Sequence, residues 1–80
     1  MTDERIDQEI LSMLSAAAGR WRKVAAVIAN VSHALDKELP DGEEAYELVA
    51  RRIGFLVNER TLLAQGDIKN WRFSEVRLPD

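Results

Sequence analysis

Seven basic side chains are the residues of this chain most suited to binding a polyanion. They are Arg20, Arg22, Lys23, Arg51, Arg52, Lys69 and Arg72. Trp21 and Trp71 lie among them, and a tryptophan between cations can serve single-stranded nucleic acid, because the ring stacks on a base while the cations neutralise phosphates. More often such an indole covers the end of a hydrophobic core and the cations remain in solvent. We favour the second interpretation.

Catalytic and metal-binding chemistry has little support in the sequence. The chain has one histidine, His33, and no cysteine, so a metal site within one chain would have to rely on carboxylates. The serines belong to no nucleophile motif, and no glycine-rich phosphate loop is present. Glu43 and Glu44 are adjacent on an expected helix and therefore diverge, so they do not form an acid–base pair. We expect no enzyme activity, no cofactor, no metal and no small-molecule substrate.

Length and composition indicate one small domain that covers residues 1–80. The chain is 46% hydrophobic and 31% charged, which is typical of a globular protein. A domain of this size buries only about 60% of the surface of its unfolded chain, so a partner or a second copy would add stability. The acidic start lacks the layout of a secretion signal, and no apolar run approaches the roughly 20 residues that span a membrane. We therefore expect a cytoplasmic protein without a membrane partner.

The net charge of −3 is unevenly distributed along the chain. Residues 1–19 carry −3, residues 20–37 carry +3, residues 38–60 carry −3, and residues 61–80 are neutral. Binding to duplex nucleic acid takes much of its affinity from the neutralisation of phosphates. The distribution therefore disfavours residues 38–60 as a surface for nucleic acid.

Three helices are expected to position these side chains. Apolar residues recur at helical spacing over residues 6–17, 24–35 and 45–56. Gly19 is suited to end the first helix, and Asp41 is the expected cap of the third, which would run to Val57.

A β-hairpin is expected to follow the third helix. Residues 62–67 and 71–78 have strand composition and are separated by turn-forming residues. The apolar residues of the second strand change parity, which predicts either a bulge near Ser74 and Glu75 or a strand that is apolar on both faces. The link at 19–22 can extend far enough to add a brief strand beside the hairpin.

The apolar faces of these elements predict one shared core. It is drawn from Ile6, Ile10, Met13, Leu14, Val24, Val27, Ile28, Val31, Leu48, Val49, Ile53, Leu56, Leu62 and Phe73. The expected fold class is α+β, mainly α, in a single domain.

Residues 51–67, with 21–25 upstream and 73–78 downstream, resemble the winged helix-turn-helix modules of a small bacterial family of unknown function. Members of that family often form a C-terminal appendage to another domain. The resemblance covers nearly the whole chain and implies three helices followed by a hairpin, the wing. Such modules usually have glycine where the third helix turns into the wing. Here Arg60 or Asn58 would have to adopt the left-handed conformation instead.

In winged helices that bind DNA, the third helix typically enters the major groove. The first turns of that helix carry acids in this chain, namely Asp41, Glu43, Glu44 and Glu47. These acids would repel a polyanion, and Glu47 is well placed to pair with Arg51 one turn later. The sequence therefore favours a structural role for this helix over reading DNA.

The leading hypothesis is a non-catalytic winged-helix module for protein interaction or dimerisation. The candidate interface residues are Tyr46, Phe55, Trp71 and Leu78, apolar side chains that a small core leaves for a partner to cover. The alternative is a nucleic-acid-binding transcriptional regulator that uses the seven basic residues.

Overall fold

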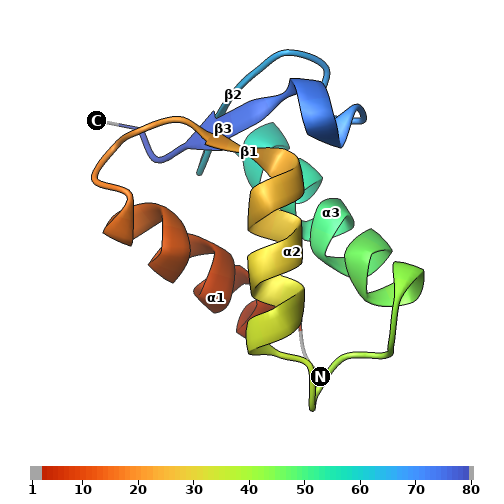
Figure 1. The fold of residues 1–80 in the computed structure, drawn as a ribbon. Helices are drawn as coiled ribbons and strands as arrows, with labels where there is room; N and C mark the ends of the chain where they lie inside the picture. Colours follow the sequence, from red (N-terminus) through yellow and green to blue (C-terminus); the bar gives the residue numbers. More distant parts are fainter. Residues whose placement is uncertain (1–2, 80) are drawn as a thin grey trace.

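The computed structural model describes residues 3–79 (Figure 1). Its elements in chain order are α1 (Asp3–Ala16), β1 (Arg22–Lys23), α2 (Val24–Ala34), α3 (Glu43–Asn58), β2 (Leu63–Gln65), the 3-10 helix η1 (Trp71–Phe73) and β3 (Glu75–Arg77). The expected fold class, α+β and mainly α with a C-terminal pair of strands, is confirmed. The brief strand between the first two helices is also present, and it lies at 22–23, later than expected.

The three helices surround one core, and each packs against the other two (Figure 1). The strands lie together at one end of the helices, and the link from α2 to α3 lies at the opposite end. The core side chains are Ile6, Ile10, Leu14, Val24, Val27, Ile28, Val31, Leu35, Leu39, Ala45, Val49, Ile53, Leu56, Leu62 and Val76. Burial of this apolar surface is the main source of the fold's stability.

The predicted core is largely correct, with three differences. Met13 and Leu48 are only partly buried and pack at its edge. Phe73 is 74% exposed, because residues 71–73 form a 3-10 turn and the alternation of a strand does not apply there. The prediction omitted four buried residues, which are Leu35, Leu39, Ala45 and Val76.

The sheet has the order β1-β3-β2, with β3 antiparallel to both neighbours. Val76 lies opposite Arg22 on one side and Ala64 on the other, and its side chain is fully buried. This one valine therefore anchors the centre of a very small sheet to the helices.

The hairpin differs from its prediction in the length of its strands. Each strand has three residues, and residues 66–74 form a long connection that contains η1. The turn η1, and not a bulge, changes the parity of the apolar side chains. Gly66 has φ +80°, and a Cβ atom there would collide with the backbone carbonyl oxygen of Phe73. The two arms of the connection thus touch through their backbones at a position that requires glycine.

Both ends of α3 are defined by unusual residues. At its start the capping position is taken by Gly42, not by Asp41, and no side chain caps the helix. At its end Arg60 is left-handed, with φ +63°, while Asn58 remains helical. The Thr61 N–H donates to the Leu56 carbonyl oxygen at 2.9 Å, and the Arg60 N–H donates to that of Val57 at 3.0 Å. This is the Schellman arrangement, with arginine in the position that glycine usually takes.

No helix in residues 3–79 is long and apolar enough to cross a membrane.

Candidate functional site

Arg52 lies on the inner side of α3, where it joins this helix to α1. Its Nη2 atom is 2.8 Å from Asp7 Oδ2, and its Nε donates to Asp7 Oδ1 at 2.9 Å. A weaker contact of 3.4 Å reaches Asp3. The hydrogen bonds to Asp7 raise the pKa of Arg52, and both side chains of this pair are more than 80% buried. The guanidinium also lies 4.3 Å from the centre of the Phe55 ring. The charge of Arg52 is thus used within the fold.

The outer side of α3 faces the hairpin connection across two hollows of about 270 and 370 Å³. A third hollow of about 490 Å³, lined by the connection alone, adjoins them at Trp71. We call this surface the α3–loop groove. From α3 it is lined by Glu43, Tyr46, Glu47, Ala50, Arg51 and Gly54, and from the connection by Asp67, Ile68, Lys69, Asn70, Trp71 and Arg72. Trp71 lines all three hollows, so its ring is the centre of the groove.

The charges of the α3–loop groove balance and are sorted along α3. The lining contains three acids, Glu43, Glu47 and Asp67, and three bases, Arg51, Lys69 and Arg72, for a net charge of zero. Along the helix the acids come first, and Arg51 follows one turn after Glu47. The expected ion pair between these two residues does not form among residues 3–79.

The floor of the groove offers an apolar surface. Tyr46 is 40% exposed, and Trp71 is partly buried against the core. Ala50 and Gly54 add only small side chains, and a Cβ atom at Gly54 would meet nothing within 4 Å. A second helix could therefore approach α3 closely here.

The structure brings together only some of the predicted cations. Arg51, Lys69 and Arg72 share the groove, and Lys23 lies at its end, where its Nζ atom donates to the Arg72 carbonyl oxygen at 3.2 Å. Arg20 and Arg22 line a separate hollow beside the end of α1.

Trp21 has a packing role. The guanidinium of Arg77 lies 5.1 Å from the centre of its ring and also reaches the Gly19 carbonyl oxygen at 3.5 Å. These contacts connect the end of β3 to the link between α1 and β1.

The predicted apolar interface residues are divided in the same way. Tyr46 and Trp71 lie in the groove, whereas Phe55 lies on the Arg52 side of α3 and Leu78 packs against the edge of the core. Phe73 and Leu63 are also exposed, at 74% and 38%, and the sequence analysis did not identify either as a surface residue. The parity change in the second strand was the one signal that could have identified Phe73.

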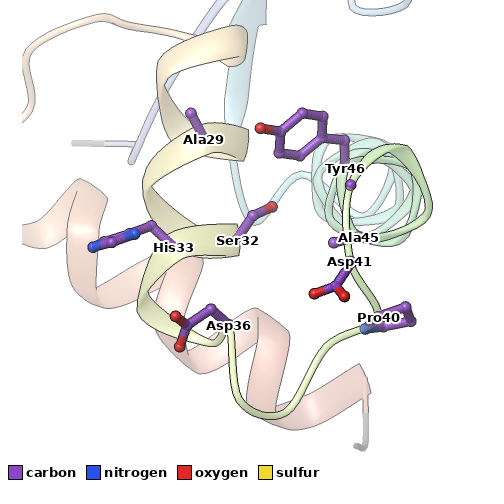
Figure 2. A pocket seen from close by; sticks show the side chains of 9 residues that line it. Ala29, Ser32, His33, Asp36, Pro40, Asp41, Ala45 and Tyr46 are labelled. Carbon is purple, nitrogen blue, oxygen red and sulfur yellow. The ribbon is translucent and has the colours of Figure 1, made fainter.

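A further hollow, of about 190 Å³, lies between the end of α2 and the start of α3 (Figure 2). Ser32, His33, Asp36, Asp41 and Tyr46 are among its lining residues. His33 is exposed in the last turn of α2. Residues 3–79 contain no group of three histidine, cysteine or carboxylate side chains that could hold a metal ion. No local sequence pattern indicates this hollow, because its residues come from two helices and the link between them.

Comparisons of the chain with models of protein families, with curated proteins and with solved structures found no match.

Proposed function

We propose that this domain is a non-catalytic winged-helix module that associates with a second copy of itself through the α3–loop groove. The order of its elements, with the sheet order β1-β3-β2, supports the winged-helix assignment. The observation that carries the proposed association is the sorting of balanced charges along an open groove with an apolar floor.

The charge pattern is complementary to itself. In a dimer with two-fold symmetry the same patch is used on both copies, so each contact occurs twice. Glu47 and Arg51 are four residues apart, which is about 6 Å along a helix. If the two-fold axis passes between them and the helices run antiparallel, Glu47 of each copy faces Arg51 of the other. Lys69, which lines the same hollow as both residues, adds a further cation beside that pair.

The apolar floor provides the surface that such a dimer would bury. Tyr46 and Trp71 are aromatic residues of the kind that contribute most at interfaces. The small side chains of Ala50 and Gly54 leave room for a facing helix. Burial of this surface would also add stability to a domain whose small size limits its own core.

The same groove is poorly suited to duplex DNA. Its three bases are offset by three acids, so little phosphate charge would be neutralised on binding. Arg52, a further cation of α3, is held by Asp7 on the other side of the helix.

The proposal is tested by sedimentation equilibrium at micromolar concentration with two charge-reversal variants. The wild-type chain is expected to be a dimer. Arg51→Glu makes the α3 side of the groove acidic and Glu47→Arg makes it basic, so each variant alone is expected to be monomeric. Mixed together, the two variants have complementary grooves and are expected to form a heterodimer.

Glu59→Arg is the matched control, because it makes the same charge change as Glu47→Arg at an exposed position outside the groove. It should remain dimeric. A wild-type chain that stays monomeric, or a pair of reversed variants that still dimerise separately, would contradict the proposal.

A second candidate function is the binding of single-stranded nucleic acid at the tip formed by β1 and η1. The observation that favours it is Phe73, which is 74% exposed and directly follows Arg72. Lys23 and Lys69 lie close by. An exposed ring beside three cations can stack on a base while phosphates are neutralised.

Fluorescence anisotropy with a labelled oligothymidylate tests this second candidate. Neutralisation of three phosphates predicts a slope of about −2 in log affinity against log salt concentration. Arg72→Glu should abolish the binding. Absence of binding at low salt would eliminate the candidate.

A further inference from the structure

The hollow between α2 and α3 has a buried floor and a polar rim. We call it the α2–α3 pocket. Ser32 and Ala45 form its floor and are only 8% and 4% exposed. The rim includes Asp41 and Tyr46, which are both exposed to solvent. The pocket thus reaches from open solvent down to a buried hydroxyl group.

The hydroxyl of Ser32 has no hydrogen-bond partner within residues 3–79. A buried polar group without a partner is costly, and native structures contain few of them. Figure 2 shows the Ser32 oxygen pointing from α2 toward α3. The Tyr46 phenol reaches back toward α2, and the Asp41 carboxylate points into the space between the helices. Three oxygen atoms from three different segments therefore face a common space.

The surroundings of the pocket are strongly acidic. Residues 36–44 contain five acids and one base, a net charge of −4. Of these acids only Glu38 has an ion-pair partner in the part of the chain that the structure describes, Arg5 at 3.7 Å. The end of α2 adds the negative end of a helix dipole. The positive end of α3 is already compensated by Glu43 and Glu44 in its first turn, so the space between the helices attracts a cation.

We propose that the α2–α3 pocket binds a primary alkylammonium group. An ammonium group has three N–H donors and no acceptor. Its donors match the Asp41 carboxylate, the Ser32 hydroxyl oxygen and the Tyr46 phenol oxygen, and the carboxylate compensates its charge. The bond to Ser32 would supply the partner that this buried hydroxyl lacks.

The size and apolar lining of the pocket fit the rest of the ligand. Its volume of about 190 Å³ corresponds to about six water molecules at 30 Å³ each, which is enough for the ammonium head and a short alkyl chain. Ala29, Pro40 and Ala45 provide apolar contacts for that chain. The inference does not depend on the proposed dimer, although Tyr46 also borders the groove.

The same chemistry is present in a free alkylamine and in the lysine side chain of another protein. The two sources share the ammonium head and the short methylene chain that the pocket recognises. They differ in the polypeptide attached to the far end of that chain, so the experiment includes one arm for each source.

Binding is measured by NMR titration of the backbone amides of the full chain with n-butylammonium chloride. We expect saturable shifts at Ser32 and over residues 41–46. Titration with n-butanol, which has nearly the same shape and no charge, should produce no such shifts. Sodium chloride at the same ionic strength controls for screening.

Two variants test the assigned contacts. Ser32→Ala and Asp41→Asn each remove one partner of a charged group, and each should weaken binding by about tenfold or more. Glu59→Gln is the matched control, since it removes an acid about 24 Å away along α3 and should leave the affinity unchanged. The amide spectrum of each free variant shows directly whether its fold is intact.

The second arm uses a blocked tripeptide with a central lysine and the same peptide with norleucine, which lacks the charge. Saturable binding of the lysine peptide with the same shifts points to a protein ligand, whereas binding of butylammonium alone points to a small amine. The proposal is overturned if neither amine gives saturable shifts, if n-butanol binds as tightly as butylammonium, or if both variants bind like the wild-type chain.

Discussion

Arg51 and Arg52 are adjacent in the sequence but belong to different surfaces of the molecule. Arg52 faces α1, makes two hydrogen bonds to Asp7 and lies over the ring of Phe55. Arg51 lies in the α3–loop groove and has no ion pair with Glu47 or with any other acid of residues 3–79. Consecutive residues of a helix point about 100° apart, which is enough to place one guanidinium inside the fold and the other outside it.

The comparison shows how the fold selects which charges remain free for a partner. The Arg52–Asp7 pair is shielded from water and bidentate, so it holds two helices together. The charges of the groove are exposed to water, where pairing within one chain contributes little. The inner side of α3 therefore uses its charge for stability, and the outer side presents its charge to another molecule.

The largest expected effect comes from the hairpin connection that forms the far wall of the groove. Gly66→Ala places a methyl group against the Phe73 carbonyl oxygen in a left-handed backbone. The strain and the displacement together should lower the free energy of unfolding by about 2–5 kcal/mol, as measured by urea denaturation. The contact of Arg52 with Asp7 should be unaffected. A loss below about 0.5 kcal/mol would show that the two arms are not in contact.

The next effect separates the two arginines directly. Arg52→Ala leaves the carboxylate of Asp7 without its partner and should cost about 1–3 kcal/mol, whereas Arg51→Ala should change stability by no more than about 0.5 kcal/mol. Both values come from denaturation monitored by circular dichroism. Equal losses would contradict the division of α3 into an inner and an outer side.

The pair of Arg52 and Asp7 also leads to a prediction about the pH dependence of stability. The hydrogen bonds to Asp7 raise the pKa of Arg52, so the guanidinium keeps its proton throughout neutral and moderately alkaline solution. On the alkaline side its contribution is lost when strongly alkaline solution removes that proton. The difference between Arg52→Ala and the wild-type chain should therefore be the same at about pH 7 and about pH 9. A smaller difference at the higher pH would contradict the assignment.

A smaller effect of opposite sign is expected at Gly54. Gly54→Ala removes glycine from a helix interior where the added methyl group meets nothing within 4 Å. The monomer should gain about 0.5–1 kcal/mol in thermal or chemical denaturation. The methyl group also narrows the groove, so sedimentation should show a weaker dimer. A variant that is more stable and also a tighter dimer would place the interface elsewhere.

The smallest effect is expected at Phe73. Its side chain is 74% exposed, so Phe73→Ser should change the free energy of unfolding by no more than about 0.5 kcal/mol. The same variant should weaken binding of an oligothymidylate if the second candidate function holds. A stability loss above about 1 kcal/mol would mean that the ring is packed in the folded chain.

Periodic elements of the fold were predicted well from local sequence, and the hairpin connection was not. The three helices follow from apolar residues at helical spacing, because a helix must bury one stripe of its surface. The strands have only three residues each, which is too short for a period to be visible. Trp71 and Phe73 have strand composition, yet residues 71–73 form a 3-10 helix, in which the Phe73 N–H donates to the Asn70 carbonyl oxygen at 3.0 Å.

The candidate site was predictable only in part. Arg51, Lys69, Tyr46 and Trp71 were identified as binding residues by type, but their meeting in one groove depends on the path of the connection across α3. Ser32 was not identified as a binding residue. What distinguishes it from the other serines is that its buried hydroxyl has no hydrogen-bond partner within residues 3–79. Such burial depends on the neighbouring helix, which a local pattern does not describe.

The sequence by itself determined the three amphipathic helices, the small single core and the absence of cysteine chemistry. These properties depend on residue type and spacing within one turn or one strand, where physical constraints are local. Only the tertiary structure decided which arginine is used by the fold, which cations share a surface and where a buried hydroxyl lacks a partner. Those outcomes depend on contacts between residues that lie on different elements, such as Arg52 and Asp7, which are 45 positions apart. The pattern within one element does not specify such contacts.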